Sequence, residues 1–101
     1  MNKLGQEIAK YFIESIPLFN ALGDHNRQLI LMYLRSDKGT SVNDLTKLMP
    51  LSRPAVSHHL KILFDLNLLK VERKGTTRLY LLDTKKALDP VRKLIDSIYK
   101  S

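Results

Sequence analysis

The sequence predicts a mainly α-helical fold that carries one β-hairpin (class α+β), in the order three or four helices, the hairpin and a final helix. Two observations carry this prediction. Apolar residues recur every three or four positions through most of the first 66 residues, which is the spacing of amphipathic helices. Two β-like runs, 68–73 and 77–82, then flank a Lys-Gly-Thr segment that is typical of a short hairpin turn.

Size and composition predict one soluble domain over residues 1–101. Because the chain has no cysteine, disulfides, thiolate metal sites and thiol redox sensing are excluded. No apolar run approaches the ~20 residues that a membrane span needs, and the N-terminus lacks the apolar stretch of a secretory signal. We therefore expect a cytoplasmic protein with no membrane partner.

The first two helices are predicted from their periodicity and from one cap. The first is marked by Leu4, Ile8, Phe12, Ile16 and Phe19. Pro17 is expected to kink or interrupt this helix near its end. Asp24 is the predicted N-cap of the second helix. The apolar residues of that helix are expected to be mostly buried: Leu29, Ile30, Leu31, Met32 and Leu34.

A short third helix is predicted to begin at a capping motif. Ser41 is followed three residues later by Asp44, which resembles a capping box. We expect this helix to bury Leu45 and Leu48, and a tight connection to follow at 49–51.

The next helix, capped by Ser52 and running to about residue 66, completes a helix-turn-helix. At ~100° per residue, Val56, Leu60 and Leu63 fall on one arc and are expected to face the core. His59 lies at the edge of that arc, so we interpret it as a packed, hydrogen-bonded residue. The outward face is small, polar or cationic, as a DNA major groove requires. Its members are Arg53, Pro54, Ser57, His58 and Lys61.

The positive charge is concentrated in this part of the chain. The net charge is +7, and residues 53–78 alone carry six basic and two acidic groups. A focused basic patch is typical of a protein that binds a polyanion, most often nucleic acid. The hairpin tip contributes Arg73, Lys74, Thr76 and Arg78. A helix-turn-helix followed by a basic hairpin is a winged helix, and its predicted partner is double-stranded DNA.

The final helix is predicted to start at Asp89–Pro90, an N-cap followed by a proline in the first turn. Its apolar stripe and a matching one on the first helix are expected to form a homodimer interface. The residues proposed for it are Ile8, Phe12, Val91, Leu94, Ile95 and Ile98.

Three segments resemble the ArsR/SmtB family of bacterial winged-helix repressors. Residues 18–34 are similar to its opening helices, with Asp24 and Arg27 in an Asp-x-x-Arg pattern. Residues 51–63 are similar to its recognition helix, and 75–82 to its wing. The resemblance implies a homodimer built from the first and last helices that binds an inverted-repeat operator. It also implies that Arg53 and His58 contact bases.

The departures from the family concern metal sensing. Members that sense metals carry cysteines where this chain has Ser41 and Asn43, and no histidine follows His59. Because Zn²⁺ prefers Cys or His ligands, we expect no metal and no cofactor. The effector is then expected to be the protein's own abundance, a small organic ligand or a protein partner.

No catalytic motif occurs, so we do not expect an enzyme. The alternative interpretation is a winged-helix module that binds a protein and not DNA. The net charge of +4 in residues 53–78 argues against that alternative, because a protein-binding wing need not be cationic.

Overall fold

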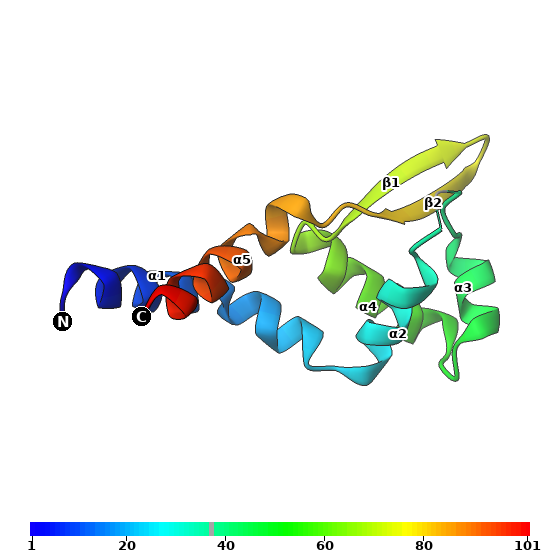
Figure 1. Cartoon of the computed structure of the whole chain (residues 1–101). Coiled ribbons are helices and arrows are strands. Elements are labelled where there is room, and N and C mark those ends of the chain that lie inside the picture. Colours follow the sequence, from blue (N-terminus) through cyan, green and yellow to red (C-terminus); the bar gives the residue numbers. More distant parts are fainter. Residues whose placement is uncertain (37) are drawn as a thin grey trace.

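The computed structural model describes residues 1–36 and 38–101, which form five helices and one antiparallel two-stranded hairpin (Figure 1). The elements are α1 (Lys3–Leu22), α2 (His25–Tyr33), α3 (Val42–Leu48), α4 (Arg53–Asp65), β1 (Leu69–Lys74), β2 (Thr77–Leu82) and α5 (Lys85–Lys100). The predicted fold class and element order are confirmed, and both strands lie within one residue of their expected bounds. Among the described residues, no helix is long and apolar enough to cross a membrane.

The chain is elongated, with extents of 53 × 24 × 18 Å. Helices α1 and α5 lie side by side at one end, where both termini also lie (Figure 1). Helices α2, α3 and α4 and the hairpin occupy the other end. The pair α1–α5 is thus separated along the long axis from the helix-turn-helix formed by α3 and α4.

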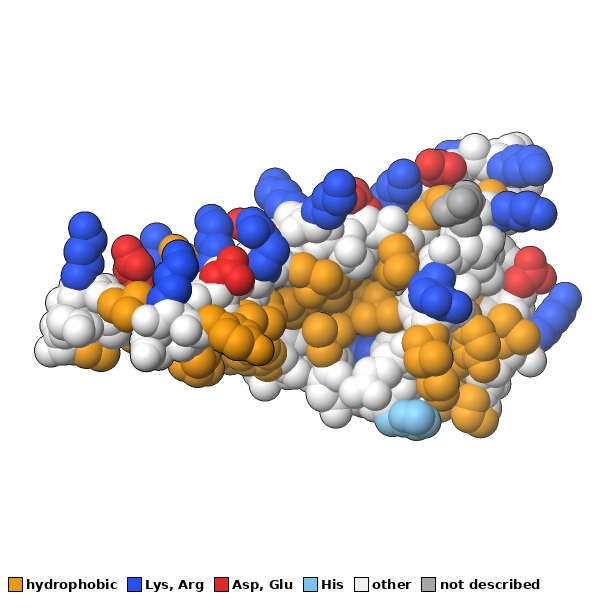
Figure 2. All heavy atoms as spheres, in the orientation of Figure 1, with side chains coloured by type: hydrophobic (Ala, Val, Ile, Leu, Met, Phe, Trp, Pro, Cys, Tyr) orange, Lys and Arg blue, Asp and Glu red, His pale blue; other side chains and the backbone are white. Residues whose placement is uncertain are grey.

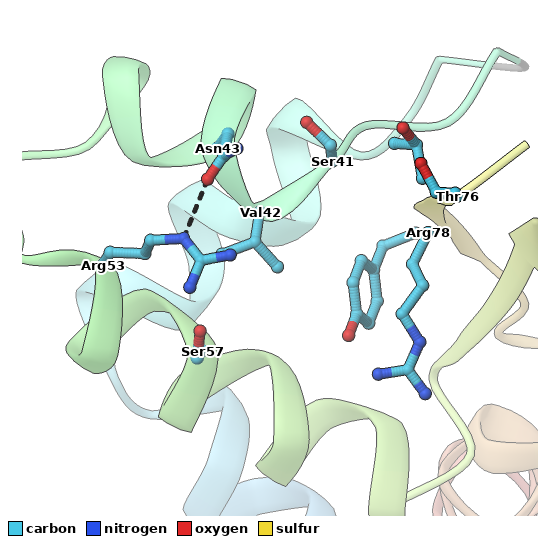
Figure 3. A pocket seen from close by; sticks show the side chains of 9 residues that line it. Ser41, Val42, Asn43, Arg53, Ser57, Thr76 and Arg78 are labelled. Carbon is cyan, nitrogen blue, oxygen red and sulfur yellow. Dashed lines mark hydrogen bonds between the residues drawn. The ribbon is translucent and has the colours of Figure 1, made fainter. Parts of the chain in front are cut away.

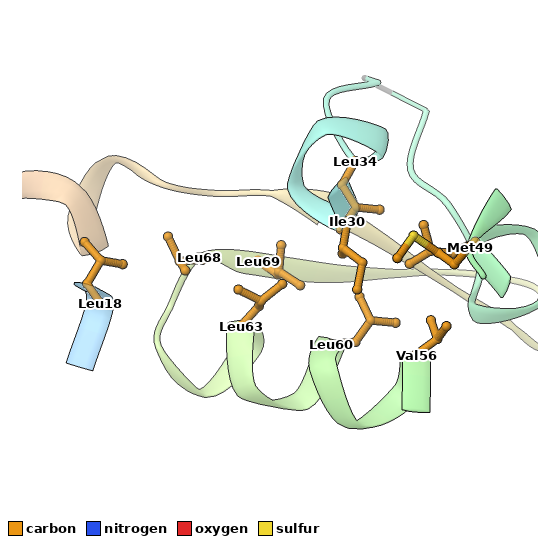
Figure 4. Close-up of a cluster of buried hydrophobic side chains, with 10 residues drawn as sticks. Leu18, Ile30, Leu34, Met49, Val56, Leu60, Leu63, Leu68 and Leu69 are labelled. Atoms are coloured by element: carbon orange, nitrogen blue, oxygen red, sulfur yellow. The ribbon is translucent and has the colours of Figure 1, made fainter. Parts of the chain in front are cut away.

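The hydrophobic core fixes the rear of α4 against α2 and β1 (Figure 4). Its largest side chains are at most 1% exposed: Ile30, Leu34, Leu45, Val56, Leu60, Leu63 and Leu68. Each fully buried leucine or isoleucine contributes about 1.5–3 kcal/mol relative to exposure. The predicted core arc of α4 is therefore confirmed, and the opposite arc of this helix is left to solvent.

Two side chains expected in the core are exposed instead. Met32 is 63% exposed because Ile30 and Leu34, four residues apart, set the buried side of α2 and Met32 lies across from them. Leu48 is 54% exposed because α3 ends at this residue, and Met49, which follows it, fills the core position.

Of the two outcomes expected for Pro17, a kink or an interruption, the interruption does not occur, because α1 continues to Leu22. Pro17 and Ile13, the residue whose carbonyl it cannot bond, are both exposed, so water can satisfy that carbonyl. Beyond the proline, Leu18 and Ala21 are buried, and their packing holds the last turn in place.

The last helix starts a full turn earlier than predicted, at Lys85, so that Pro90 lies inside it. Ala87 and Val91 pack against the core from either side of the proline, and this burial extends the helix upstream. Asp89 is therefore a helical residue and not the N-cap.

A left-handed residue directs the chain from α4 into the hairpin. Asn67 has φ 62°, and its N–H donates to the Phe64 carbonyl at 3.0 Å. The Leu68 N–H donates to the Leu63 carbonyl at 3.1 Å. This pair of bonds is a Schellman motif, and it places Leu68 in the core directly before β1.

Candidate nucleic-acid interface

The two helices of the helix-turn-helix begin at serine caps. The Ser41 hydroxyl accepts from the Asp44 N–H at 3.1 Å, and the Ser52 hydroxyl accepts from the Ala55 N–H at 3.3 Å. Both predicted caps are confirmed. Because its cap fixes where α4 starts, Arg53 becomes the first helical residue of α4 and projects from its N-terminal end.

The outward face of α4 has the predicted character. Pro54, His58 and Lys61 are exposed, and Ser57 is half-buried where it faces the hairpin side. The Lys61 ammonium lies 3.0 Å from the Asp65 carboxylate one turn later. The charge of Lys61 is therefore partly neutralised, unlike that of the arginines near it.

The β1–β2 hairpin, which we call the wing, is anchored to the chain between α2 and α3. The Thr40 N–H donates to the Tyr80 carbonyl at 3.0 Å, and the Tyr80 N–H donates to the Thr40 carbonyl at 2.9 Å. At the tip, a two-residue turn has Gly75 in its first position with φ 64°, as a type II′ turn requires. These constraints hold the wing beside α3 and α4.

The wing presents exposed cations to solvent. Arg73 pairs with Arg78 and Lys74 pairs with Thr77 across the two strands. All four are exposed. Directly opposite residues point to the same face of an antiparallel pair, so the two arginines share one side of the wing.

A groove of about 460 Å³ lies between α3, the start of α4 and the wing. Arg53 and Arg78 stand on opposite sides of it, with the Ser57 side chain between them (Figure 3). Further hydroxyl groups come from Ser41 and Thr76. Guanidinium groups and hydroxyls are the donors that bind phosphate and base edges in DNA complexes, so the lining suits a nucleic-acid strand.

The Arg53 side chain is held from the neighbouring helix. Its Nε donates to the Asn43 Oδ1 at 2.8 Å (Figure 3). Asn43 is not among the residues that the sequence predicts for the interface. Its place in the first turn after the Ser41 cap is the signal that could have found it, because that turn faces the start of α4.

A second polar cluster lies behind α4 and links it to α2. The Arg27 Nε donates to the His59 Nδ1 at 3.2 Å, and the Arg27 N–H donates to the Asp24 carboxylate at 3.1 Å. Burial lowers the pKa of His59, while the bond from the Arg27 N–H lowers the pKa of Asp24. His59 is thus a packed, hydrogen-bonded residue, as expected.

The predicted DNA-binding residues come together in part. Arg53, Ser57, Thr76 and Arg78 line the one groove. The remaining members lie exposed along α4 or on the wing: Pro54, His58, Lys61, Arg73 and Lys74. No group of three or more His, Cys, Asp or Glu side chains that could hold a metal occurs within residues 1–36 and 38–101.

The residues expected in the dimer interface differ in burial within the single chain. Leu94 is 4% exposed, because α5 packs on α1 of its own chain, and Ile8 and Val91 are half-buried. Six apolar side chains of α1 and α5 remain between 42% and 68% exposed: Phe12, Ile13, Ile16, Phe19, Ile95 and Ile98. In Figure 2, hydrophobic side chains gather below a row of Lys and Arg that follows α5 and the wing.

Comparison with known proteins places this arrangement in a family. Residues 24–71, from the start of α2 into β1, match the family model described as bacterial regulatory protein, arsR family. The chain is also 31% identical to the transcriptional repressor SdpR of Bacillus subtilis, over 82% of this chain and 91% of that protein. The chain belongs to the ArsR family.

The chain is also similar to a second curated repressor and to a solved structure. The arsenical resistance operon repressor of Bacillus subtilis is 44% identical over 61% of this chain. The match spans 59% of the length of that repressor. An ArsR-like transcriptional regulator from Rhodococcus sp. RHA1 superposes with a TM-score of 0.80 at 25% identity, over 91% of this chain and 84% of that one. These relatives are described as regulators or repressors of transcription, in line with the expectation of a protein that is not an enzyme. The superposition on the Rhodococcus structure confirms the predicted winged helix-turn-helix fold.

Proposed function

We propose that this ArsR-family protein is a homodimeric repressor that binds an inverted-repeat operator in double-stranded DNA. It would act in the cytoplasm as a single winged-helix domain over residues 1–101. The observation that carries the proposal is the groove between α4 and the wing, with Arg53 and Arg78 on opposite sides. A sugar-phosphate backbone fits this groove chemically, because cations and hydroxyl donors line it and none of the described residues that line it carries a carboxylate.

In this proposal α4 enters the major groove. Arg53 lies at its N-terminal end, from which residues of recognition helices approach base edges. A guanidinium pairs with guanine O6 and N7 in bidentate fashion. Ser57, His58 and Lys61 lie further along the outward face, where they reach bases or the adjacent phosphates.

The wing supplies the contacts that do not depend on sequence. Arg73, Lys74 and Arg78 carry three positive charges without a carboxylate within salt-bridge distance among the described residues. Such cations bind phosphate and release counterions, which makes affinity depend on salt. Thr76 at the tip adds a hydroxyl donor.

The exposed apolar residues of α1 and α5 support the dimer. Phe12 and Ile16 on α1 and Ile95 and Ile98 on α5 are each 46–50% exposed. Exposed apolar side chains gathered on two helices that pack together are typical of an interaction site. A C2 dimer would present its two α4 helices to major grooves about one turn, ~34 Å, apart, so the operator should be a short inverted repeat.

The DNA proposal is tested by selection. The purified protein is mixed with random genomic duplex fragments at physiological salt, and the retained fragments are sequenced. We expect one enriched motif made of two inverted half-sites. No retention would instead favour the module that binds a protein, and retention without an enriched motif would contradict binding to a specific operator.

The dimer is tested by sedimentation of the wild type and of a double variant. Ile95→Asp with Ile98→Asp places two charges on the exposed apolar side of α5 and should yield a monomer. The matched control, Met32→Asp with Leu48→Asp, charges two residues that are as exposed but lie on α2 and α3. A wild type that sediments as a monomer at micromolar concentration contradicts the proposal.

A further inference from the structure

The contact between Asn43 and Arg53 joins the two helices of the helix-turn-helix at the edge of the groove. Asn43 lies in the first turn of α3, and Arg53 is the first residue of α4. The bond, 2.8 Å from Arg53 Nε to Asn43 Oδ1, spans ten residues of sequence. Both side chains are exposed, so the core does not require this bond.

The chemistry of the guanidinium makes the choice of nitrogen important. Arginine has five N–H donors in one plane, one on Nε and four on the two terminal nitrogens. With Nε held by Asn43, the terminal nitrogens stay free for a bidentate contact. Fixing Nε also fixes the plane of the group and removes rotamer freedom that binding would otherwise cost.

Asn43, the partner of Arg53, is a neutral amide, although the residue that follows it, Asp44, carries a carboxylate. The Asp44 carboxylate pairs with the Lys47 ammonium at 3.6 Å, one turn along α3. Among the described residues no carboxylate lies within salt-bridge distance of Arg53, so its positive charge is not offset while its direction is set. This arrangement suits a residue that must meet an electronegative base edge near phosphates.

We propose that Asn43 is a positioning residue that determines base specificity through Arg53. It orients the guanidinium toward one base pair of each half-site and does not itself contact DNA. The inference rests on the proposed function, because it takes Arg53 as the base-reading residue.

The test compares Asn43→Ala, Arg53→Ala and the double variant by fluorescence anisotropy. Each is titrated with the selected operator, with operators changed at single base pairs, and with a random duplex, at two salt concentrations. Arg53→Ala identifies the base pair that Arg53 reads, by loss of about 5- to 150-fold discrimination there. We expect Asn43→Ala to lose at least about threefold discrimination at that same base pair.

The other measurements separate positioning from direct contact. Asn43→Ala should leave affinity for random duplex and the salt dependence unchanged, and should add nothing in the Arg53→Ala background. Asn43→Asp keeps the acceptor but adds a negative charge, so it should weaken binding to all duplexes and retain the base preference. Asn20→Ala, which removes an exposed amide from α1, is the matched control and should change nothing.

Two results would overturn the inference and leave DNA binding intact. In one, Arg53→Ala relaxes the preference at a base pair while Asn43→Ala does not. In the other, Asn43→Ala lowers affinity for every duplex even when Arg53 is absent, which makes Asn43 a phosphate contact. If Arg53→Ala alone changes neither affinity nor preference, the proposed function itself loses its base-reading residue.

Discussion

Arg73 and Arg78 lie directly opposite each other on the two strands of the wing. Like charges at directly opposed positions repel and cost about 0.2–1 kcal/mol of stability. Relieving this pair with Arg73→Thr should raise the free energy of unfolding by about that amount. The same change should weaken binding to any duplex and lower the salt slope by about one per protomer. Urea unfolding and anisotropy measure the two effects.

Lys70→Thr is the control for that prediction. It removes one positive charge from the same strand, but Lys70 is opposite Leu81 and lies 3.7 Å from the Glu72 carboxylate. We therefore expect no gain in stability. Equal stability changes in Arg73→Thr and Lys70→Thr would mean that the opposed arginines do not repel measurably.

Ser15 is a second residue that is expected to lower the stability of the folded chain. Its side chain is 1% exposed in α1, and its hydroxyl has no hydrogen-bond partner among the described residues. Leaving a buried hydroxyl unpaired costs about 1–3 kcal/mol. Ser15→Ala should therefore raise Tm by several degrees in a thermal melt. Asn20→Ala, exposed on the same helix, measures the gain from helix propensity alone, and an equal rise in both variants would refute the explanation.

The pH dependence of stability should report on His59. Burial lowers its pKa below the ordinary value of about 6.5, so the folded state binds the proton more weakly than the unfolded state. Well above pH 6.5 the group is neutral in both states and contributes no pH dependence. As the pH falls below that value, the unfolded chain gains a proton first and stability decreases, until the folded pKa is passed.

His59→Asn should remove this decrease in urea titrations as the pH falls below about 6.5, whereas His25→Asn, at an exposed site, should keep it. Asp24, whose pKa is lowered by the Arg27 N–H, loses its contribution only as the pH falls below about 3.9. If the wild type and His59→Asn lose stability equally as the pH falls below about 6.5, burial does not lower the pKa of His59.

Metals should not release the protein from its operator. The Ser41 hydroxyl is engaged as the cap of α3, and the Asn43 carbonyl oxygen is engaged by Arg53. Neither residue type is a thiolate or an imidazole, which Zn²⁺ prefers. We expect Zn²⁺, Cd²⁺ and arsenite at one equivalent per protomer to leave the anisotropy of the complex unchanged. Release at that ratio would reveal a ligand set that these residues do not suggest.

Local interactions made the helix starts predictable. Asp24, Ser41 and Ser52 each accept an N–H from three residues later, and such a bond depends only on the sequence around it. The inward arc of α4 was predictable for a related reason, because a period of 3.6 residues divides any amphipathic helix into two faces.

Features set by tertiary packing were not predictable in this way. The start of α5 depends on contacts of Ala87 and Val91 with a core assembled from other helices. Periodicity also shows that Leu94 lies on an apolar stripe but not which helix covers it, and α1 of the same chain does so. The Asn43–Arg53 bond likewise joins two helices whose crossing the sequence does not specify.

The salt dependence of duplex affinity, measured for three variants on two DNAs, decides whether the groove and the wing form the DNA-binding surface. We expect Arg53→Ala to cost about 1–3 kcal/mol on the selected operator and little on random duplex. Lys74→Ala should weaken both DNAs alike and lower the salt slope by about one per protomer, while Lys3→Ala, far from the groove, changes neither. If Arg53→Ala and Lys74→Ala bind both duplexes as tightly as the wild type at low and high salt, the groove and the wing are not a DNA-binding surface.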